Sequence, residues 1–149
     1  MRDSLFLCIP SEILFKFMSS ILFVDLLAKT IDSGASYNIK LLHTLLQDAK
    51  ISSVIFDWNS EFPEKVAPDM AAQKILTYSP QIVAFSTITC NFLDSLIISR
   101  EIKRLSPQIL VLFGGPQASI VADKLISRFS WIDAVSIGES ETKIVTLVQ

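Results

Sequence analysis

The sequence is poor in the residues that hold metals and form disulfides. Its 149 residues contain two cysteines, Cys8 and Cys90, and a single histidine, His43. Two distant cysteines form neither a disulfide framework nor the paired spacing of a zinc site. They are also too few to ligate an iron–sulfur cluster. We therefore expect a chain from a reducing, cytoplasmic compartment that holds no metal through its own cysteines.

Blocks of positive charge and long apolar runs are missing as well. Lysine and arginine number 13 against 15 aspartates and glutamates, and no basic block occurs, which argues against nucleic acid as a partner. Residues 5–28 are strongly apolar, but charged residues and a proline interrupt them before about 18 apolar residues accumulate. The small-residue cleavage site of a signal peptide is absent. We therefore expect no membrane segment.

Several common catalytic motifs are also absent. The sequence has no G-x-G-x-x-G after its first apolar run, no P-loop and no G-x-S-x-G elbow. A phosphoacceptor receiver domain would place its acceptor near Asp57, but it also needs an acidic pair after the first strand and a lysine after the fifth. Here Asp25 stands alone and Gly138-Glu139 replaces the lysine. We therefore expect no catalytic side chain in this chain.

The most informative stretch that is present runs from Ile109 to Ser119. The apolar run Ile109–Phe113 is typical of a strand buried on both faces, and it ends at Gly114-Gly115-Pro116. Apolar residues in Gln117–Phe129 then recur at helical spacing. A strand, a glycine turn and a helix build either a ligand crevice at the carboxyl end of a sheet or a plain tight turn. Both interpretations stay open at this point.

Apolar runs and helical spacings alternate along the whole chain. The runs are separated by stretches long enough for crossover connections, which predicts a parallel sheet. We expect an α/β fold: a doubly wound, flavodoxin-like five-stranded parallel sheet of order 2-1-3-4-5 with helices on both faces. In that order the segments after the first, third and fourth strands meet at one rim. The predicted strands are Ile21–Val24, Val54–Phe56, Gln81–Phe85, Ile109–Phe113 and Ile132–Ile137, and the predicted helices are Ser36–Lys50, Met70–Tyr78, Phe92–Leu105, Gln117–Phe129 and one carrying Ile144, Val145 and Val148.

The ends and surfaces of these elements can be assigned in part. Residues 1–18 form a leader in which Leu5–Ile9 fits an edge strand, and one hypothesis takes Met18 as the true initiator. Residues 19–149 form one Rossmann-like domain. In the helix 36–50, Asn38 shares a face with the leucines while His43 falls on the solvated face, so His43 is expected to be a surface residue. Asp69 is expected to cap the next helix, after an irregular polar loop.

A cluster of hydroxyl side chains follows the third predicted strand. Ser86, Thr87 and Thr89 lie where a ligand would be hydrogen-bonded in this architecture. The same residue types are ordinary caps for a following helix. The cluster alone therefore allows both a binding role and a structural one.

Four stretches together carry a resemblance to a known family. They are Ile82–Thr89, Ile102-Lys103, Phe113–Ser119 and Gly138–Glu141. In this order and spacing they resemble the cobalamin-binding domain at the amino end of cobalamin-dependent radical S-adenosylmethionine enzymes, over roughly residues 19–149. The resemblance implies cobalamin as the cofactor, with its nucleotide tail in a crevice beside the sheet. It implies as cofactor-binding residues Asp25, Ser86, Thr87, Ile88, Thr89, Gly114, Gly115, Pro116, Gln117, Ala118, Gly138 and Glu139.

The sequence departs from the family pattern at three places. Many cobalamin domains carry Asp-x-His-x-x-Gly after the first strand, but residues 25–30 here contain no histidine, so no imidazole ligand to cobalt is expected. Gln117 and Ser119 replace the usual histidine and threonine of the glycine loop. The Cys-x-x-x-Cys-x-x-Cys motif of the catalytic domain is absent. We therefore expect this chain to bind cobalamin and to rely on a radical S-adenosylmethionine domain or protein for catalysis.

A competing hypothesis treats the chain as a degenerate flavodoxin-like interaction domain that binds no cofactor. The apolar surplus of the helix 92–105 would then be its working face. A Gly115→Val variant separates the two views of the glycine turn. If the glycine admits a ligand, the variant folds and loses cobalamin; loss of the fold indicates a tight turn, since valine tolerates positive φ poorly.

Overall fold

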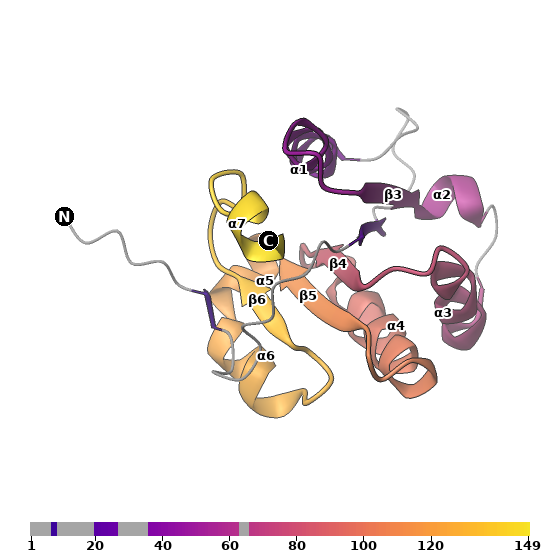
Figure 1. The fold of residues 1–149 in the computed structure, drawn as a ribbon. Coiled ribbons are helices and arrows are strands. Elements are labelled where there is room, and N and C mark those ends of the chain that lie inside the picture. Colours follow the sequence, from indigo (N-terminus) through magenta and orange to yellow (C-terminus); the bar gives the residue numbers. More distant parts are fainter. Residues whose placement is uncertain (1–6, 9–19, 27–35, 63–65) are drawn as a thin grey trace.

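The computed structural model describes residues 7–8, 20–26, 36–62 and 66–149 (Figure 1). Strands and helices alternate through the described part of the chain, as the apolar runs predict. In chain order the elements are β1 (Leu7–Cys8), β2 (Ile21–Asp25), α1 (Tyr37–Asp48), β3 (Ser53–Asp57), α2 (Trp58–Glu61), α3 (Pro68–Leu76), β4 (Ile82–Ser86), α4 (Phe92–Leu105), β5 (Leu110–Gly114), α5 (Pro116–Ile120), α6 (Ala122–Arg128), β6 (Ala134–Ser136) and α7 (Ile144–Val148).

The strands form one sheet of order β1-β6-β5-β4-β2-β3. The strands from β2 to β6 are all parallel, and without β1 their order is the predicted 2-1-3-4-5. The flavodoxin-like prediction is therefore confirmed. β1 pairs antiparallel with β6, through Leu7 opposite Ser136 and Cys8 opposite Val135. This pairing confirms the edge strand predicted within Leu5–Ile9, while the rest of the leader lies outside the described residues.

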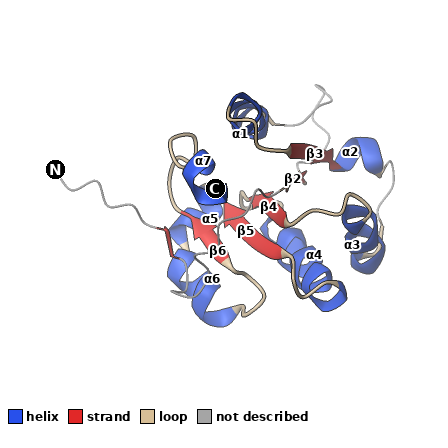
Figure 2. Ribbon diagram, in the orientation of Figure 1, coloured by secondary structure: helices blue, strands red, loops and turns tan. Residues whose placement is uncertain are grey.

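Helices cover both faces of the sheet (Figure 2). Alternate residues of each strand point to opposite faces, so Leu22 and Val24 join one apolar cluster while Ile21 and Phe23 join the other. The first cluster packs under α3, α4, α5 and α6, and the second packs under α1 and α7. Burial on both sides explains why these strands read as continuous apolar runs.

The predicted helix Gln117–Phe129 is instead two short helices. Val121, at φ −115° and ψ 19°, ends α5, and α6 begins at the next residue. Ala118, Ala122 and Leu125 are all buried, so the apolar spacing persists across the break. Spacing reports which side chains are buried and carries no information on whether the backbone between them stays helical, which is why the prediction was wrong here.

The loop after β3 is also more ordered than predicted. The Asp57 carboxylate accepts hydrogen bonds from the Asn59 backbone N–H at 3.1 Å and the Ser60 hydroxyl at 2.8 Å, which starts the short helix α2. Asp57 is thus a helix cap. Phe62 follows α2 and packs on Trp58, with ring centroids 4.7 Å apart.

A hydrogen bond between Tyr78 and Glu61 joins the end of α2 to the turn that follows α3. The Tyr78 hydroxyl donates to the Glu61 carboxylate at 2.7 Å, which lowers the pKa of Glu61 and raises the pKa of Tyr78.

Asp69 lies inside the first turn of α3, whose N-cap is Ala67. The prediction of Asp69 as the cap was wrong because Pro68 sets the helical φ and takes the first position.

His43 is not the solvated residue that its helical position suggested. It is half-buried, and its Nδ1 lies 2.8 Å from the Ser53 hydroxyl oxygen. The Gln47 side-chain amide donates to the same hydroxyl at 3.1 Å. This network ties α1 to the start of β3. Along α1 the fully buried residues are Ile39 and Leu46, whereas Asn38 is exposed.

The helix α4 has the predicted bounds, and its apolar residues form a wide core face rather than the free working face of the competing hypothesis. Leu96, Ile98 and Ile102 are buried in the core, and Leu93 and Leu105 are exposed. Ser99, also buried, accepts a hydrogen bond at 3.1 Å from the indole N–H of Trp131. Most of the apolar surplus therefore packs against α3 and the sheet.

Candidate functional site

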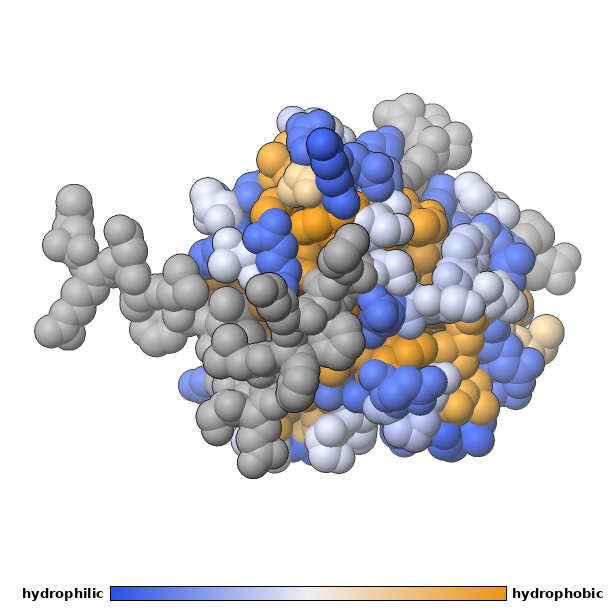
Figure 3. Space-filling view, in the orientation of Figure 1, coloured by the Kyte–Doolittle hydropathy of each residue, from blue (hydrophilic) through white to orange (hydrophobic). Residues whose placement is uncertain are grey.

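A cleft opens at the carboxyl edge of the sheet, between α1 and α7. Apolar side chains are visible between these two helices on the molecular surface (Figure 3). The inner slot of the cleft has a volume of about 40 Å³ and its mouth about 300 Å³. The inner slot is lined by Phe23, Ile39, Leu42, Ala84, Phe85, Ser86, Leu112, Gly114, Gly115, Ser136, Ser140 and Ile144. The mouth is lined by Asn38, Leu42, Ser86, Gly115, Pro116, Ser119, Gly138, Glu139, Ser140 and Glu141.

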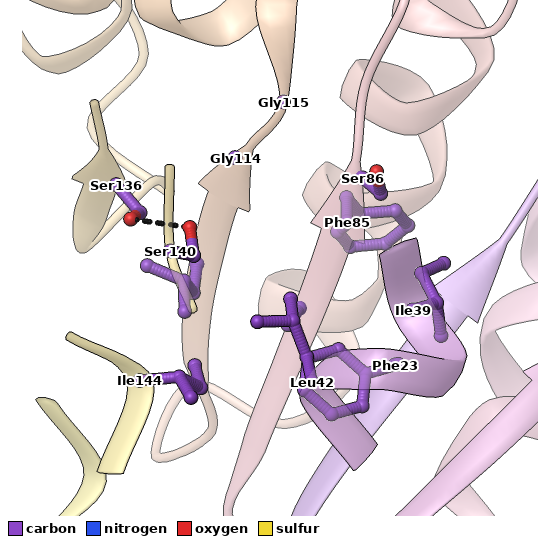
Figure 4. Close-up of a pocket in the computed structure, with 12 residues that line it drawn as sticks. Phe23, Ile39, Leu42, Phe85, Ser86, Gly114, Gly115, Ser136, Ser140 and Ile144 are labelled. Atoms are coloured by element: carbon purple, nitrogen blue, oxygen red, sulfur yellow. Dashed lines mark hydrogen bonds between the residues drawn. The ribbon is translucent and has the colours of Figure 1, made fainter. Parts of the chain in front are cut away.

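The inner slot is apolar apart from a few hydroxyls. Figure 4 shows Ser136, Ser140 and Ile144 on one side of it and residues of β2 and α1 on the other. The hydroxyl oxygens of Ser136 and Ser140 lie 2.8 Å apart, within hydrogen-bonding distance. Ser86, at the end of β4, lines both the slot and the mouth. The slot therefore continues into a more polar entrance.

The two glycines after β5 have different roles. A Cβ added at Gly114 would lie 3.8 Å from the Cβ of Ser136 and 4.0 Å from the hydroxyl of Ser140, so this position faces the slot at ordinary contact distance. Gly115 has φ +92° and ψ 174°, a conformation essentially restricted to glycine. A Cβ there would lie 2.6 Å from the carbonyl oxygen of Thr87. Gly115 is therefore required by the turn itself.

Thr87 holds the loops after β4 and β5 together. Its side chain is fully buried, and its hydroxyl donates to the Gly114 carbonyl at 2.8 Å and accepts from the Ala118 N–H at 3.2 Å. Its backbone N–H also donates to the Gly114 carbonyl at 2.8 Å, and its carbonyl accepts from the Gln117 N–H at 3.2 Å. These bonds fix the backbone that forms one wall of the cleft.

The predicted site residues divide into two groups. Ser86, Gly114, Gly115, Pro116, Gly138 and Glu139 line the cleft. The residues that do not line it are Asp25, Thr87, Ile88, Thr89, Gln117 and Ala118.

The members of the second group support the loops around the cleft. Asp25 is buried and its carboxylate accepts a hydrogen bond from the Ser36 N–H, which joins the end of β2 to the start of α1. The hydroxyl of Thr89 donates to the side-chain oxygen of Gln117 at 3.1 Å. Ile88 is 37% exposed, and its N–H donates to the Asn91 side chain at 2.9 Å. A binding role for this group stays a prediction.

The structure adds cleft residues that sequence reasoning missed. Ser136 ends the short strand β6, and Ser140 lies in the Gly-Glu-Ser-Glu stretch, where only its neighbours were selected. Ile39 and Leu42 come from α1, whose orientation over the sheet decides which residues reach the cleft. The carboxyl ends of strands were a usable signal for the serines, but no sequence signal marks the α1 residues.

The mouth of the cleft carries a buried acceptor. The carboxylate oxygen Oε2 of Glu141 is buried and has no hydrogen-bond partner within the described part of the chain. The loop before it is fixed: the Gly138 N–H donates to the Ser119 hydroxyl at 3.0 Å, and that hydroxyl donates to the Gly115 carbonyl at 2.9 Å. A buried oxygen with no partner is costly unless a ligand supplies one.

A metal-binding cluster and a membrane-crossing helix are both absent from residues 7–8, 20–26, 36–62 and 66–149. Within these ranges, no three or more histidine, cysteine, aspartate or glutamate residues gather in a way that could hold a metal ion. Over the same ranges, no helix has the length and apolarity that crossing a bilayer requires.

Comparison with known proteins gives three findings. The family model described as "B12 binding domain" matches residues 25–148. An anaerobic magnesium-protoporphyrin IX monomethyl ester cyclase from Rubrivivax gelatinosus is 28% identical over 83 residues, which are 56% of this chain and 15% of the cyclase. The radical S-adenosylmethionine methyltransferase TsrM from Kitasatospora setae, solved with tryptophan and a SAM analogue, superposes with a TM-score of 0.70 at 20% identity. That superposition covers 87% of this chain and 25% of TsrM.

Proposed function

Because the chain belongs to the B12-binding domain family, we propose that it binds cobalamin in the cleft between α1 and α7. The inner slot is the observation that supports this most. It is an apolar crevice at the carboxyl edge of a parallel sheet, the place where doubly wound folds bind ligands. At Gly114 the wall of the slot is bare backbone, and a larger side chain would fill it.

The residues of the cleft fit the chemistry of the cofactor. The tail of cobalamin ends in a flat, largely apolar base, which suits the slot, and its corrin ring carries amide side chains, which suit the polar mouth. The slot volume of about 40 Å³ accommodates roughly three water molecules. Entry of a bicyclic base therefore requires α1 and α7 to move apart. Residues proposed to contact the tail are Ser86, Gly114, Ser136 and Ser140, together with Ile39 and Leu42 of α1.

The cobalt is proposed to receive no imidazole from this chain. The chain has one histidine, His43, which is engaged with Ser53 between α1 and β3 and does not line the cleft. When bound, cobalamin supplies a cobalt centre suited to methyl transfer or radical chemistry. The residues of this chain bind the cofactor and orient it.

A catalytic partner is part of the proposal. The chain spans 15% of the cyclase and 25% of TsrM, so both proteins contain much more than the part that matches. TsrM is itself a radical S-adenosylmethionine methyltransferase. We infer that the chemistry belongs to a radical S-adenosylmethionine domain or protein that works with this chain.

Purified protein mixed with hydroxocobalamin and then desalted is expected to keep the visible absorbance of the corrinoid at near-equimolar ratio. Bovine serum albumin treated in the same way gives the background. A colourless protein that is folded by circular dichroism contradicts the proposal and favours an interaction domain without a cofactor.

Replacing Glu141 with methionine is expected to weaken cobalamin binding about fivefold, the equivalent of one lost hydrogen bond, without lowering the stability of the free protein. The variant removes a buried oxygen that lacks a partner, and removing such an atom is neutral or stabilising in the free state. In the complex, the same oxygen is proposed to accept a hydrogen bond from an amide of the cofactor.

The matched control is Glu139→Met, which removes the same charge from the same loop. Glu139 is exposed at the mouth, so its replacement is expected to cost less affinity because water screens exposed charges. Spectrophotometric titration gives the affinities, and urea unfolding gives the stabilities. Equal losses for the two variants would show that charge, rather than the buried oxygen, is what matters.

A further inference from the structure

The inner slot is nearly closed in this structure, although a roomier mouth lies directly outside it. The slot has a volume of about 40 Å³ and the mouth about 300 Å³, and both are lined by Leu42, Ser86, Gly115 and Ser140. One wall of the slot belongs to α1, and the opposite wall is formed by Ser140 and by Ile144, where α7 begins (Figure 4). One of these two walls must move before a molecule much larger than water can enter.

The wall formed by α1 is tied to the sheet at both ends of the helix. At its start the Ser36 N–H donates to the Asp25 carboxylate at the end of β2. Near its end the Gln47 side-chain amide donates to the Ser53 hydroxyl at 3.1 Å and to the Ser53 carbonyl at 3.3 Å. Between them, Nδ1 of His43 lies 2.8 Å from the same hydroxyl. Moving α1 would break all of these bonds, so α1 is the fixed wall.

The wall formed by α7 is held mainly by apolar packing. Ile144 and Val148 are buried in the apolar cluster under α1 and α7. The Ile144 N–H donates to the Ser140 carbonyl at 2.8 Å, inside the loop that leads into the helix. That loop is joined to β6 through the hydroxyls of Ser136 and Ser140, whose oxygens lie 2.8 Å apart. In the described part of the chain, α7 and its loop thus have fewer hydrogen bonds to the strands than α1 has.

A hinge for this second wall lies at Gly138. The Gly138 N–H donates to the Ser119 hydroxyl at 3.0 Å, which holds the chain on the side of β6. Gly138 has φ +74°, and a Cβ there would meet nothing within 4 Å, so the chain beyond it has space to rotate. The closed position also carries a cost, because Oε2 of Glu141 is buried without a hydrogen-bond partner in the described part of the chain. Opening would give that oxygen to water.

Resting on the proposed function, we propose that residues 139–148 form a gate over the inner slot, closed in the free protein and opening about Gly138 to admit the cofactor. The hydroxyl pair of Ser136 and Ser140 is the latch of the gate, and opening withdraws Ile144 from the slot. Because the latch is one hydrogen bond of the closed state, its removal is expected to raise the open population about fivefold. Binding is then limited by how often the gate opens.

Hydrogen–deuterium exchange of the free full chain measures the gate without any cofactor. The amides of α7 are expected to exchange about fivefold faster in Ser140→Ala than in the unchanged chain, while the amides of α1 keep their rates. Thr146→Ala is the matched control, because it removes a hydroxyl from an exposed position of α7 and leaves the latch intact. It is expected to change neither rate. If Ser140→Ala speeds exchange equally in α7 and α1, or has no effect on α7, the gate is overturned.

Stopped-flow mixing with excess hydroxocobalamin measures the coupling of the gate to binding, through quenching of the fluorescence of Trp58 and Trp131. The observed rate is expected to rise with cofactor concentration and then to level off, at a ceiling about fivefold higher in Ser140→Ala and unchanged in Thr146→Ala. A rate that stays linear in concentration, or one ceiling shared by all three proteins, overturns the gate and leaves the proposed function standing. Absence of binding in all three overturns the proposed function and, with it, the role of the gate.

Discussion

Replacing Gly115 with valine is expected to destabilise the fold by about 3 kcal/mol or more, because two costs add at this position. The backbone has φ +92° and ψ 174°, which L-residues almost never adopt. The new Cβ would also lie 2.6 Å from the carbonyl oxygen and 2.8 Å from the nitrogen of Thr87. Both atoms are held there by hydrogen bonds to residues on either side of Gly115, since the Thr87 N–H donates to the Gly114 carbonyl and the Thr87 carbonyl accepts from the Gln117 N–H. Urea unfolding followed by circular dichroism measures the loss.

The matched control for this prediction is Gly138→Ala. Gly138 also has positive φ, at +74°, but a Cβ there would meet nothing within 4 Å. Its replacement therefore carries the backbone cost alone, about 1 kcal/mol. If Gly115→Val were as mild as Gly138→Ala, the close approach to Thr87 would not constrain the turn.

Replacing Gly114 with valine is expected to leave the fold intact and to weaken cobalamin binding at least about tenfold. Gly114 is the last residue of β5, where a β-branched side chain is favourable. Its Cβ would make ordinary contacts with Ser136 and Ser140, but the two methyl groups beyond it would occupy a slot of about 40 Å³. The proposed tail of the cofactor then has no room beside the sheet.

Gly114→Ala gives the graded control, because its single methyl group sits at contact distance and fills less of the slot. Binding is measured by titration with hydroxocobalamin, and folding by the urea midpoint. Gly114→Val that is folded and binds as well as the natural chain would place the ligand elsewhere. Loss of the fold in Gly115→Val is expected whether or not a ligand binds, so that variant alone does not test binding. Gly114→Val does, because its expected effect is on cobalamin affinity and not on the fold.

Much of the fold could be predicted because its determinants are local. The runs at 21–24, 82–85 and 109–113 are apolar because both faces of these strands are buried. The stretches between the strands are long enough for crossover connections, which favours a parallel sheet. The break at Val121 could not be predicted, because the buried residues keep their helical spacing across it. His43 was misplaced because its hydrogen-bond partner, Ser53, lies on another element.

The site could be predicted less completely, because tertiary contacts assign its roles. Gly114 and Gly115 are equivalent in the sequence, and only the approach of Thr87, from 27 residues earlier, gives them different functions. Ser136 and Ser140 become a pair when the loop after β6 folds back on the strand. Ile39 and Leu42 reach the cleft because α1 packs against β2 and β3. Amino-acid composition and the spacing of apolar residues give no information on these contacts between distant parts of the chain.

The pairing of β1 with β6 has a consequence for any shortened form of the protein. Leu7 and Cys8 cover the outer border of the sheet opposite Val135 and Ser136. A polypeptide starting at Met18 would leave that border uncovered, with backbone donors and acceptors ready to pair with a neighbouring molecule. The self-association of such a polypeptide is expected to rise with its concentration for a reason unrelated to corrinoids.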